Sequence, residues 1–137
     1  MNIRTYQPQD LAAVIALWQV CGLTRPWNDP AKDIAFAMAG ATSTILIGEI
    51  ADEIIASIMV GHDGHRGALY YFAVAPAQQR GGLGSQLHAA AAKWLRNKSV
   101  WKINILVRKE NAKVAAFYQR SGYGRQDTLS FGKLITE

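Results

Sequence analysis

The sequence lacks the features that mark secreted, metal-binding and membrane proteins. Its one cysteine, Cys21, has no partner for an internal disulfide, and no group of Cys and His residues has the spacing of a zinc site. Acidic residues between positions 49 and 53 interrupt the longest apolar stretch, and the first ten residues are charged and lack the apolar core of a signal peptide. We therefore expect a soluble, cytoplasmic protein with no membrane association and no metal.

Charge of either sign is not concentrated in the sequence. Lys and Arg number 15 against 10 Asp and Glu, for a formal net charge of +5, but no dense basic run resembles a nucleic-acid-binding arm. The excess suits an anionic partner, for which a small phosphate-bearing molecule fits at least as well as nucleic acid. Because 50% of the 137 residues are hydrophobic and 18% are charged, we expect one globular domain over residues 1–137.

A glycine-rich turn stands out in residues 70–87, between an apolar strand and an amphipathic helix. Gly81, Gly82 and Gly84 allow positive φ and leave room for a ligand to approach the backbone. A helix that begins here directs unpaired N–H groups and its positive dipole end at the turn, which predicts an anion site. Neither a Walker P-loop nor a dinucleotide fingerprint fits the spacing, and a glycine turn without a ligand stays the alternative.

The periodicity of apolar residues predicts an alternation of strands and helices along the chain. Cys21 continues the apolar stripe of the first helix, so we expect it in the core and not as a nucleophile. The expected elements are a strand at 2–6, helices at 11–21 and 31–39, strands at 44–50, 54–61 and 68–74, a helix at 83–97, a strand at 103–107, a helix at 111–121, and strands at 123–125 and 129–135. We expect the strands at 44–50 and 54–61 to form a hairpin, and Gly22 and Gly122 to end the first and the last helix.

The glycine turn resembles motif A of the GNAT superfamily of acyl-CoA N-acyltransferases, V-x-P-x-x-[QR]-x-x-G-x-[GA]. The residues that carry the motif are Val74, Pro76, Gln79, Gly82 and Gly84. The sequence departs from the commonest form in one place, since Arg80 stands where that form has glycine. The resemblance implies a pyrophosphate-binding loop in which Arg80 adds positive charge.

A second stretch, residues 111–123, resembles GNAT motif B, N-x-x-A-x-x-[FL]-Y-x-x-x-G-[FY]. Val114 replaces the family alanine, while Asn111, Phe117 and Tyr118 match. Seven residues at about 100° each bring Tyr118 to within about 20° of Asn111 around the helix. Taken alone, Asn111 is also a good N-cap and Tyr118 an ordinary amphipathic tyrosine. The motif therefore favours acyl-CoA binding only because it occurs together with motif A.

The order of the elements is also that of the GNAT fold, and essentially the whole chain resembles the small bacterial YpeA type within the superfamily. The resemblance implies an α/β (α+β) architecture. In it a mixed, mostly antiparallel sheet of six to seven strands is splayed between strands 4 and 5 and flanked by four helices.

The same resemblance implies transfer of an acetyl group from acetyl-CoA to a primary amine of a small molecule or peptide, by direct attack in a ternary complex. Acetyl-CoA is then the cosubstrate, and the protein is a monomer or homodimer. The first alternative is an acyl-CoA-binding regulatory module without turnover, and the weaker second alternative is a basic nucleic-acid-binding domain.

Site residues follow from the resemblance. Tyr118 is implied as general acid, since a phenol with a pKa of about 10 matches the departing thiolate. The backbone N–H of Phe72 is implied as a contact to the thioester oxygen. The implied cofactor-binding residues are Phe72, Val74, Gln79, Arg80, Gly81, Gly82, Gly84, Ser85, Asn111 and Phe117.

The general base stays open. Peptide N-terminal acetyltransferases of the superfamily often carry a Glu at the position of Leu106. Asp63 or His65, in the polar turn before the central strand, is the candidate, with His62 of the same turn, Glu49 and a chain of waters as further possibilities.

The acceptor site is expected in the irregular segment 24–30, which forms one wall of that site in GNAT folds. The candidates there are Arg25, Trp27, Asn28 and Asp29, together with Asp63. The competing interpretation is that Trp27 covers the core and that Asp29 caps the helix beginning at Pro30.

Overall fold

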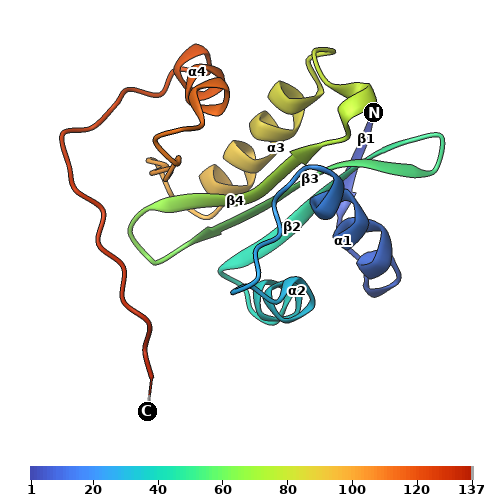
Figure 1. Cartoon of the computed structure of the whole chain (residues 1–137), viewed down its shortest axis with the longest axis horizontal. Helices are drawn as coiled ribbons and strands as arrows, with labels where there is room; N and C mark the ends of the chain where they lie inside the picture. Colours follow the sequence, from blue (N-terminus) through green and yellow to red (C-terminus); the bar gives the residue numbers. More distant parts are fainter. Residues whose placement is uncertain (137) are drawn as a thin grey trace. The chain divides into compact units, whose positions relative to one another are not determined.

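The structure is a computed structural model that describes residues 1–136. The chain divides into two compact units, Met1–Asn104 and Ile105–Glu137. The first unit is a β-sheet with helices on both faces, and the described part of the second contains a single helix (Figure 1).

The sheet of the first unit has four strands in the order β1-β2-β3-β4, and every neighbouring pair is antiparallel. The strands are β1 (Asn2–Thr5), β2 (Ser43–Ile50), β3 (Glu53–His62) and β4 (Gly67–Val74). The predicted hairpin is confirmed, and its turn residues Ala51 and Asp52 both have positive φ, 50° and 63°. Positive φ at both positions is the requirement of a type I′ turn, whose twist matches that of the paired strands.

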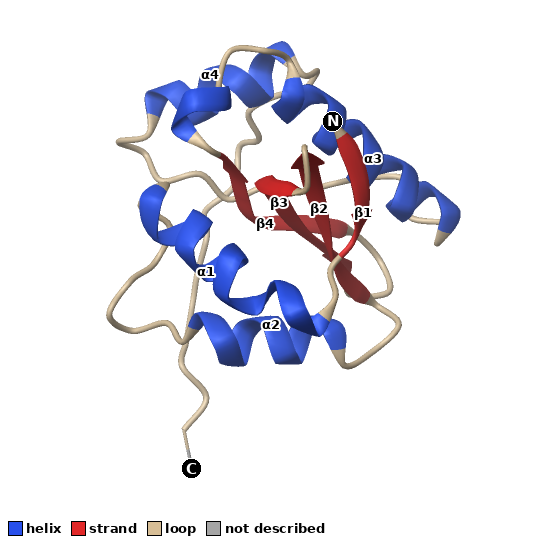
Figure 2. Cartoon of the chain, turned by 90° about the vertical axis from the view of Figure 1, so that its right-hand side faces the viewer, coloured by secondary structure: helices blue, strands red, loops and turns tan. Residues whose placement is uncertain are grey.

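Helices cover both faces of this sheet (Figure 2). They are α1 (Leu11–Val20), α2 (Pro30–Met38) and α3 (Leu83–Asn97), with short 3₁₀ turns η1 (Pro8–Asp10) and η2 (Pro76–Gln78). Side chains alternate along β2, so that Ile45 and Ile47 pack in a core with α1 and α2, whereas Leu46 lies beside α3. The sheet is therefore buried on both faces.

The end of α1 agrees with the sequence. Gly22 follows the helix with φ 70°, and Cys21 packs partly buried against the core. The thiol of Cys21 donates to the carbonyl oxygen of Val74 at 3.4 Å, and burial raises its pKa. Its packing against the core agrees with the sequence. A thiol with a raised pKa is also a poor nucleophile, as expected for a packing residue.

The sheet is smaller than predicted. Six to seven strands were expected, but the described residues form four. The predicted strand at 103–107 is reduced to one parallel bridge between Ile103 and Gly67. Two hydrogen bonds flank the bridge, from Gly67 N–H to Lys102 O at 2.8 Å and from Asn104 N–H to Gly67 O at 2.9 Å. Within residues 1–136, the expected splay between strands 4 and 5 therefore has no counterpart.

The two strands predicted at 123–125 and 129–135 are also absent from the described part of the chain. Leu129, Phe131 and Ile135 are 82%, 89% and 97% exposed. Alternating hydrophobicity predicts which side chains could pack, but a strand exists only where a neighbour pairs with its backbone. The sequence pattern carries no information about that neighbour, and the prediction was wrong here.

The second unit is built on α4 (Ala112–Arg120). Asn111 caps the helix, since its side-chain oxygen accepts from Val114 N–H at 3.3 Å. Gly122 follows with φ 97°, the left-handed conformation that commonly ends helices. Both helix ends predicted from motif B are confirmed.

Candidate functional site

The glycine turn joins β4 to α3. Val74 ends the strand, and Gly82 is the N-cap of α3 with φ 79°, which any other residue adopts with strain. The side-chain amide of Gln79 donates to Val74 O at 2.9 Å and so closes the turn against the strand. The turn holds one continuous set of predicted cofactor residues: Val74, Gln79, Arg80, Gly81, Gly82, Gly84 and Ser85.

The N-terminus of α3 is open toward this turn. The helix has 15 residues, no side chain caps it, and its first turn contains no acidic residue. Its first N–H groups have no partner within the helix, and Gln86 N–H to Gly82 O, at 3.2 Å, is the bond that begins the helical ladder. Arg80, two residues before the N-cap, is exposed. Dipole, N–H groups and guanidinium together favour a bound phosphate.

A bulge interrupts β4 before the turn. The register with β3 shifts between Ser57 and Met59, so Tyr71 and Phe72 both lie opposite Ile58. Tyr71 has φ 49°, which is uncommon for a residue other than glycine. A bulge redirects the strand that contains it, and here it does so at Phe72, the residue expected to contact the thioester.

Side chains from three other elements hold Tyr71. Its ring stacks on Trp18 of α1, with centroids 3.8 Å apart and planes 7° from parallel. Its phenol donates to Asp33 Oδ2 of α2 at 2.6 Å, while Ser57 Oγ of β3 donates to its carbonyl oxygen at 3.2 Å. Trp18 Nε1 donates to Ser57 Oγ at 2.8 Å. We call these four residues, Trp18, Asp33, Ser57 and Tyr71, the Tyr71 clamp.

The surroundings of Tyr71 also keep its phenol protonated. Burial is the larger cause and the Asp33 carboxylate the smaller one, and both raise the pKa of Tyr71 above its usual value.

In the segment between α1 and α2, the structure agrees with one part of the competing interpretation and contradicts the other. Trp27 is 70% exposed, so the interpretation that it covers the core is wrong. Asp29 Oδ1 accepts from Lys32 N–H at 3.2 Å and caps α2, as the competing interpretation expected. Asn28 N–H donates to Arg25 O at 3.0 Å. An acceptor contact by Trp27, Asn28 and Asp29 stays a prediction.

Asp63 and His65 lie in the turn between β3 and β4. Asp63 Oδ1 accepts from the N–H groups of Arg66 and His65, both at 2.8 Å, and these bonds hold the pKa of the carboxyl below its usual value. The eight-residue strand β4, about 25 Å long, separates this turn from the glycine turn. A role for either residue as base or acceptor contact stays a prediction, and these contacts do not favour it.

Glu49, a further candidate base, belongs to an ion-pair network beside β1. Arg4 Nε donates to Glu49 Oε1 at 2.8 Å. This bond lowers the pKa of Glu49, which makes the carboxylate a weaker base. Glu49 is in β2, which β3 separates from β4, and this position also argues against a catalytic role.

In the second unit, Tyr118 is buried within an aromatic group. Its ring meets those of Phe117 and Tyr123 edge to face, with centroids 5.4 and 5.2 Å apart. Burial raises the pKa of Tyr118 to about 12. The phenol is therefore protonated at neutral pH, as an acid must be. It is a weaker acid than a thiol of ordinary pKa, about 8.5, and a nearby thiolate would raise its pKa further, so this environment does not by itself favour proton donation.

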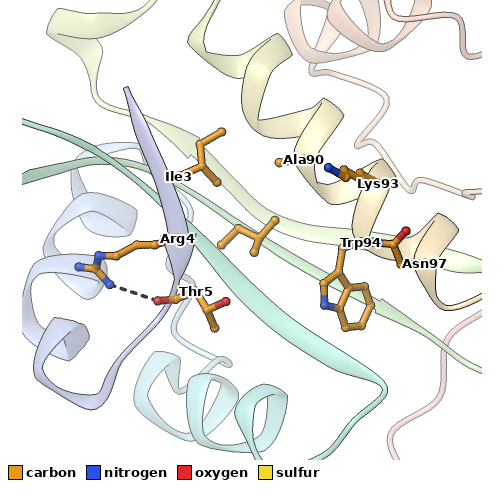
Figure 3. A pocket seen from close by; sticks show the side chains of 8 residues that line it. Ile3, Arg4, Thr5, Ala90, Lys93, Trp94 and Asn97 are labelled. Atoms are coloured by element: carbon orange, nitrogen blue, oxygen red, sulfur yellow. Dashed lines mark hydrogen bonds between the residues drawn. The ribbon is translucent and has the colours of Figure 1, made fainter.

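A shallow pocket of about 260 Å³ lies elsewhere, between β1 and α3 (Figure 3). Its lining residues are Ile3, Arg4, Thr5, Leu46, Ala90, Lys93, Trp94 and Asn97, and none was predicted as a site residue. Arg4 is engaged by Asp10 and Glu49, so its charge is already neutralised. Across residues 1–136, no group of three or more His, Cys, Asp or Glu side chains could hold a metal ion. No helix in the same range is long and apolar enough to cross a membrane.

The sequence reasoning missed the Tyr71 clamp. Ser57 offered a usable signal, because it is the single polar side chain within an apolar strand and is 0% exposed, and a buried hydroxyl needs a partner. Asp33 follows the start of a helix, where an acidic residue is ordinary. Nothing in the sequence around Tyr71 predicts a bulge.

Comparison with known proteins identifies the family of the chain. A model of the acetyltransferase (GNAT) family matches residues 12–123. Acetyltransferase YE1169 of Yersinia enterocolitica serotype O:8 / biotype 1B is 39% identical over 135 residues, which cover 98% of this chain and 96% of the relative.

Solved structures share the fold at low sequence identity. AAC(6')-Iy in complex with the bisubstrate analog CoA-S-monomethyl-acetylneamine has a TM-score of 0.83 and 17% identity, and the match covers 98% of each chain. A predicted acetyltransferase from Clostridium acetobutylicum with acetyl-CoA has a TM-score of 0.78 and 15% identity, over 96% of this chain and 95% of that one. Since the family model and the Yersinia relative both span most of the sequence, the chain belongs to the GNAT family and is an N-acetyltransferase.

Proposed function

We propose that this protein transfers the acetyl group of acetyl-CoA to a primary amine of a small molecule or peptide, by direct attack in a ternary complex. The observation that carries the proposal is the uncapped N-terminus of α3, reached from β4 through Gly82 and preceded by Arg80. The pyrophosphate of acetyl-CoA is an anion of the charge and shape that such a turn accepts. The Clostridium protein of the same fold, which was solved with acetyl-CoA, supports this choice.

In this proposal the cosubstrate lies along the end of β4 and the glycine turn. Backbone groups of Phe72 and Val74 take the pantetheine arm. The pyrophosphate is bound by the turn residues Gln79, Arg80, Gly81, Gly82, Gly84 and Ser85. Asn111 and Phe117 complete the cofactor set. Since the family model runs through both compact units, we treat residues 1–137 as one acetyltransferase domain, acting in the cytoplasm as a monomer or homodimer.

The reaction needs three groups. The neutral amine attacks the thioester carbon, and the Phe72 N–H stabilises the oxyanion that develops. The carbon–sulfur bond then breaks, and Tyr118 donates its proton to the departing thiolate. The nitrogen loses its extra proton to water. Asp63 and His65 rank behind water as bases because of their turn contacts and their place at the far end of β4.

The acceptor is proposed to bind near the segment between α1 and α2. The exposed ring of Trp27 offers an apolar surface, and Asn28 and Asp29 offer polar groups beside it. A carboxylate next to an aromatic ring suits a cationic amine. Asp63, in the turn between β3 and β4, is the fourth member of this set.

Ser85→Glu tests the anion site without damaging the fold. Position 85 is the third residue of α3, where a glutamate interacts favourably with the helix dipole, so stability should hold or rise. The same charge would repel pyrophosphate, and the Kd for acetyl-CoA should rise roughly tenfold or more by isothermal titration. The matched control, Asn97→Glu, adds the same charge about 18 Å along the helix and should leave the Kd unchanged.

Two further measurements separate the competing functions. If wild-type protein binds mixed DNA and not acetyl-CoA, it is a nucleic-acid-binding domain. If it binds acetyl-CoA but releases no CoA with any member of a panel of primary amines, it is a regulatory module. Release of CoA in step with acetylated amine supports the transferase.

A further inference from the structure

We infer that Tyr71 and Ser57 are positioning residues for the acetyl transfer. Together with Trp18 and Asp33, they fix the orientation of the peptide unit between Tyr71 and Phe72, from which the proposed oxyanion contact is made. The inference rests on the proposed function, because the thioester it concerns arrives with acetyl-CoA.

The conformation of Tyr71 is the first observation. Its φ of 49° lies in the left-handed region, inside an eight-residue strand whose other residues pair regularly on either side of the shift. A glycine would adopt this conformation without strain, whereas a tyrosine keeps it only where its surroundings impose it. Strained residues of this kind cluster at functional sites, and this one directly precedes Phe72.

The second observation is how firmly the residue is held. The Trp18 ring and the Ser57 hydroxyl are each 0% exposed, so the part of the clamp that touches Tyr71 is anchored in the core. The stacked ring, the phenol bond to Asp33 and the carbonyl bond from Ser57 come from three different elements. Movement of Tyr71 would therefore break several contacts at once, among them two partly buried hydrogen bonds.

The third observation links the clamp to chemistry. Ser57 Oγ donates to the carbonyl oxygen of Tyr71, and that carbonyl shares one rigid peptide plane with the N–H of Phe72. In a trans peptide the N–H points opposite to the C=O. The hydroxyl of Ser57 therefore sets the direction of the Phe72 N–H, and a hydrogen bond at one end of a peptide unit also strengthens donation at the other.

The test compares two ligands that differ at one group: acetyl-CoA and its thioether analogue S-ethyl-CoA, which lacks the carbonyl oxygen. The variants are Ser57→Ala and Tyr71→Phe, with Tyr70→Phe as the matched control because Tyr70 is the neighbouring tyrosine of β4 and is 54% exposed. Isothermal titration gives the preference for acetyl-CoA over the thioether. The isotope-edited infrared band of the bound acetyl carbonyl reports its polarisation directly.

We expect Ser57→Ala to lose about five- to tenfold of the preference, and Tyr71→Phe about two- to fivefold, with S-ethyl-CoA affinity unchanged. The carbonyl band should move toward its position in free acetyl-CoA in both variants and stay in place in Tyr70→Phe. Ser57→Thr, which keeps the hydroxyl, should restore the preference in part. Should Ser57→Ala fail to fold because Trp18 Nε1 loses its acceptor, Tyr71→Phe decides the question.

The outcomes distinguish the inference from the function on which it rests. A folded Tyr71→Phe protein with wild-type preference and an unshifted carbonyl band overturns the inference and leaves acetyl-CoA binding intact. Equal loss of affinity for both ligands also overturns it, because that pattern describes general damage to the site. Failure of the wild-type protein to bind either ligand instead refutes the proposed function.

Discussion

Arg4 holds Asp10 through two parallel hydrogen bonds, from Nη1 to Oδ2 at 2.7 Å and from Nη2 to Oδ1 at 2.9 Å. Asp10 is 5% exposed, and the bonds from Arg4 hold its pKa below the usual value. A carboxyl whose pKa is lower in the folded protein stabilises it above the unfolded pKa, about 3.9, and loses that contribution as the pH falls through the folded pKa.

This relationship predicts an acid-sensitive fold. Arg4→Gln should lower the free energy of unfolding by about 2 kcal/mol at pH 7, since it leaves a buried carboxylate short of its partner. The loss should shrink as the pH falls below about 4, where Asp10 is protonated in the unfolded chain. Urea unfolding at both pH values measures the difference, and a penalty independent of pH would contradict the assignment.

Asp29 allows charge and capping to be separated. Asparagine is as good an N-cap as aspartate, so Asp29→Asn should keep α2 stable and remove only the carboxylate charge. We expect it to raise the KM for a cationic amine several-fold with no change in Tm. Asp29→Ala, which removes the cap as well, should cost about 1 kcal/mol of stability. If Asp29→Asn has a wild-type KM for an identified acceptor, the residue is a cap and nothing more.

Tyr118→Phe should lower kcat by about 10²- to 10⁴-fold with little change in acetyl-CoA affinity, because the ring remains and only the proton donor is lost. Tyr123→Phe is the matched control, since burial also raises the pKa of this neighbouring tyrosine to about 12. An acid must be protonated to act. Because the pKa of Tyr118 is about 12, the phenol keeps its proton at pH 9, and kcat should not fall at that pH through ionisation of this residue. A Phe variant with full kcat would make Tyr118 a packing residue.

The turn between β2 and β3 can be improved. Ala51 and Asp52 have φ of 50° and 63°, a conformation that Asn-Gly adopts with less strain. Replacing both, as Ala51→Asn with Asp52→Gly, should stabilise the protein by about 1 kcal/mol and raise Tm by about 3 °C. Acetyl-CoA affinity should be unchanged, because the glycine turn and the Tyr71 clamp contain neither residue. A lower Tm would show that the side chains of Ala51 and Asp52 make contacts that outweigh the strain.

Local signals in the sequence predicted local features well. Gly22 and Gly122 at helix ends, Asn111 as a cap and the glycine turn before α3 depend on residues close in the chain, and each is confirmed. The last strands were mispredicted because pairing depends on a distant partner. Residues 129–135 show a strand pattern while their apolar side chains stay exposed.

The same distinction between local and distant residues applies to the candidate site. The glycine turn, proposed as the anion site, is one continuous stretch and could be predicted from glycine spacing and helix physics. The Tyr71 clamp could not, because its four residues come from four elements, and the bulge that unites them is a property of sheet register. The family resemblance supplied the roles proposed for Phe72 and Tyr118, which neither residue's local pattern indicates.

The long sequence separations within the clamp have a consequence for refolding. Trp18 and Ser57 are 39 residues apart, Asp33 and Tyr71 are 38 apart, and Ser57 and Tyr71 are 14 apart. Contacts of such separation form only after large loops have closed, so the bulge should be completed late, after α3 and the hairpin. In a stopped-flow refolding experiment, the far-ultraviolet circular dichroism signal should therefore recover before the ability to discriminate acetyl-CoA from its thioether. A partly folded chain would then have its secondary structure but would bind the two ligands equally well.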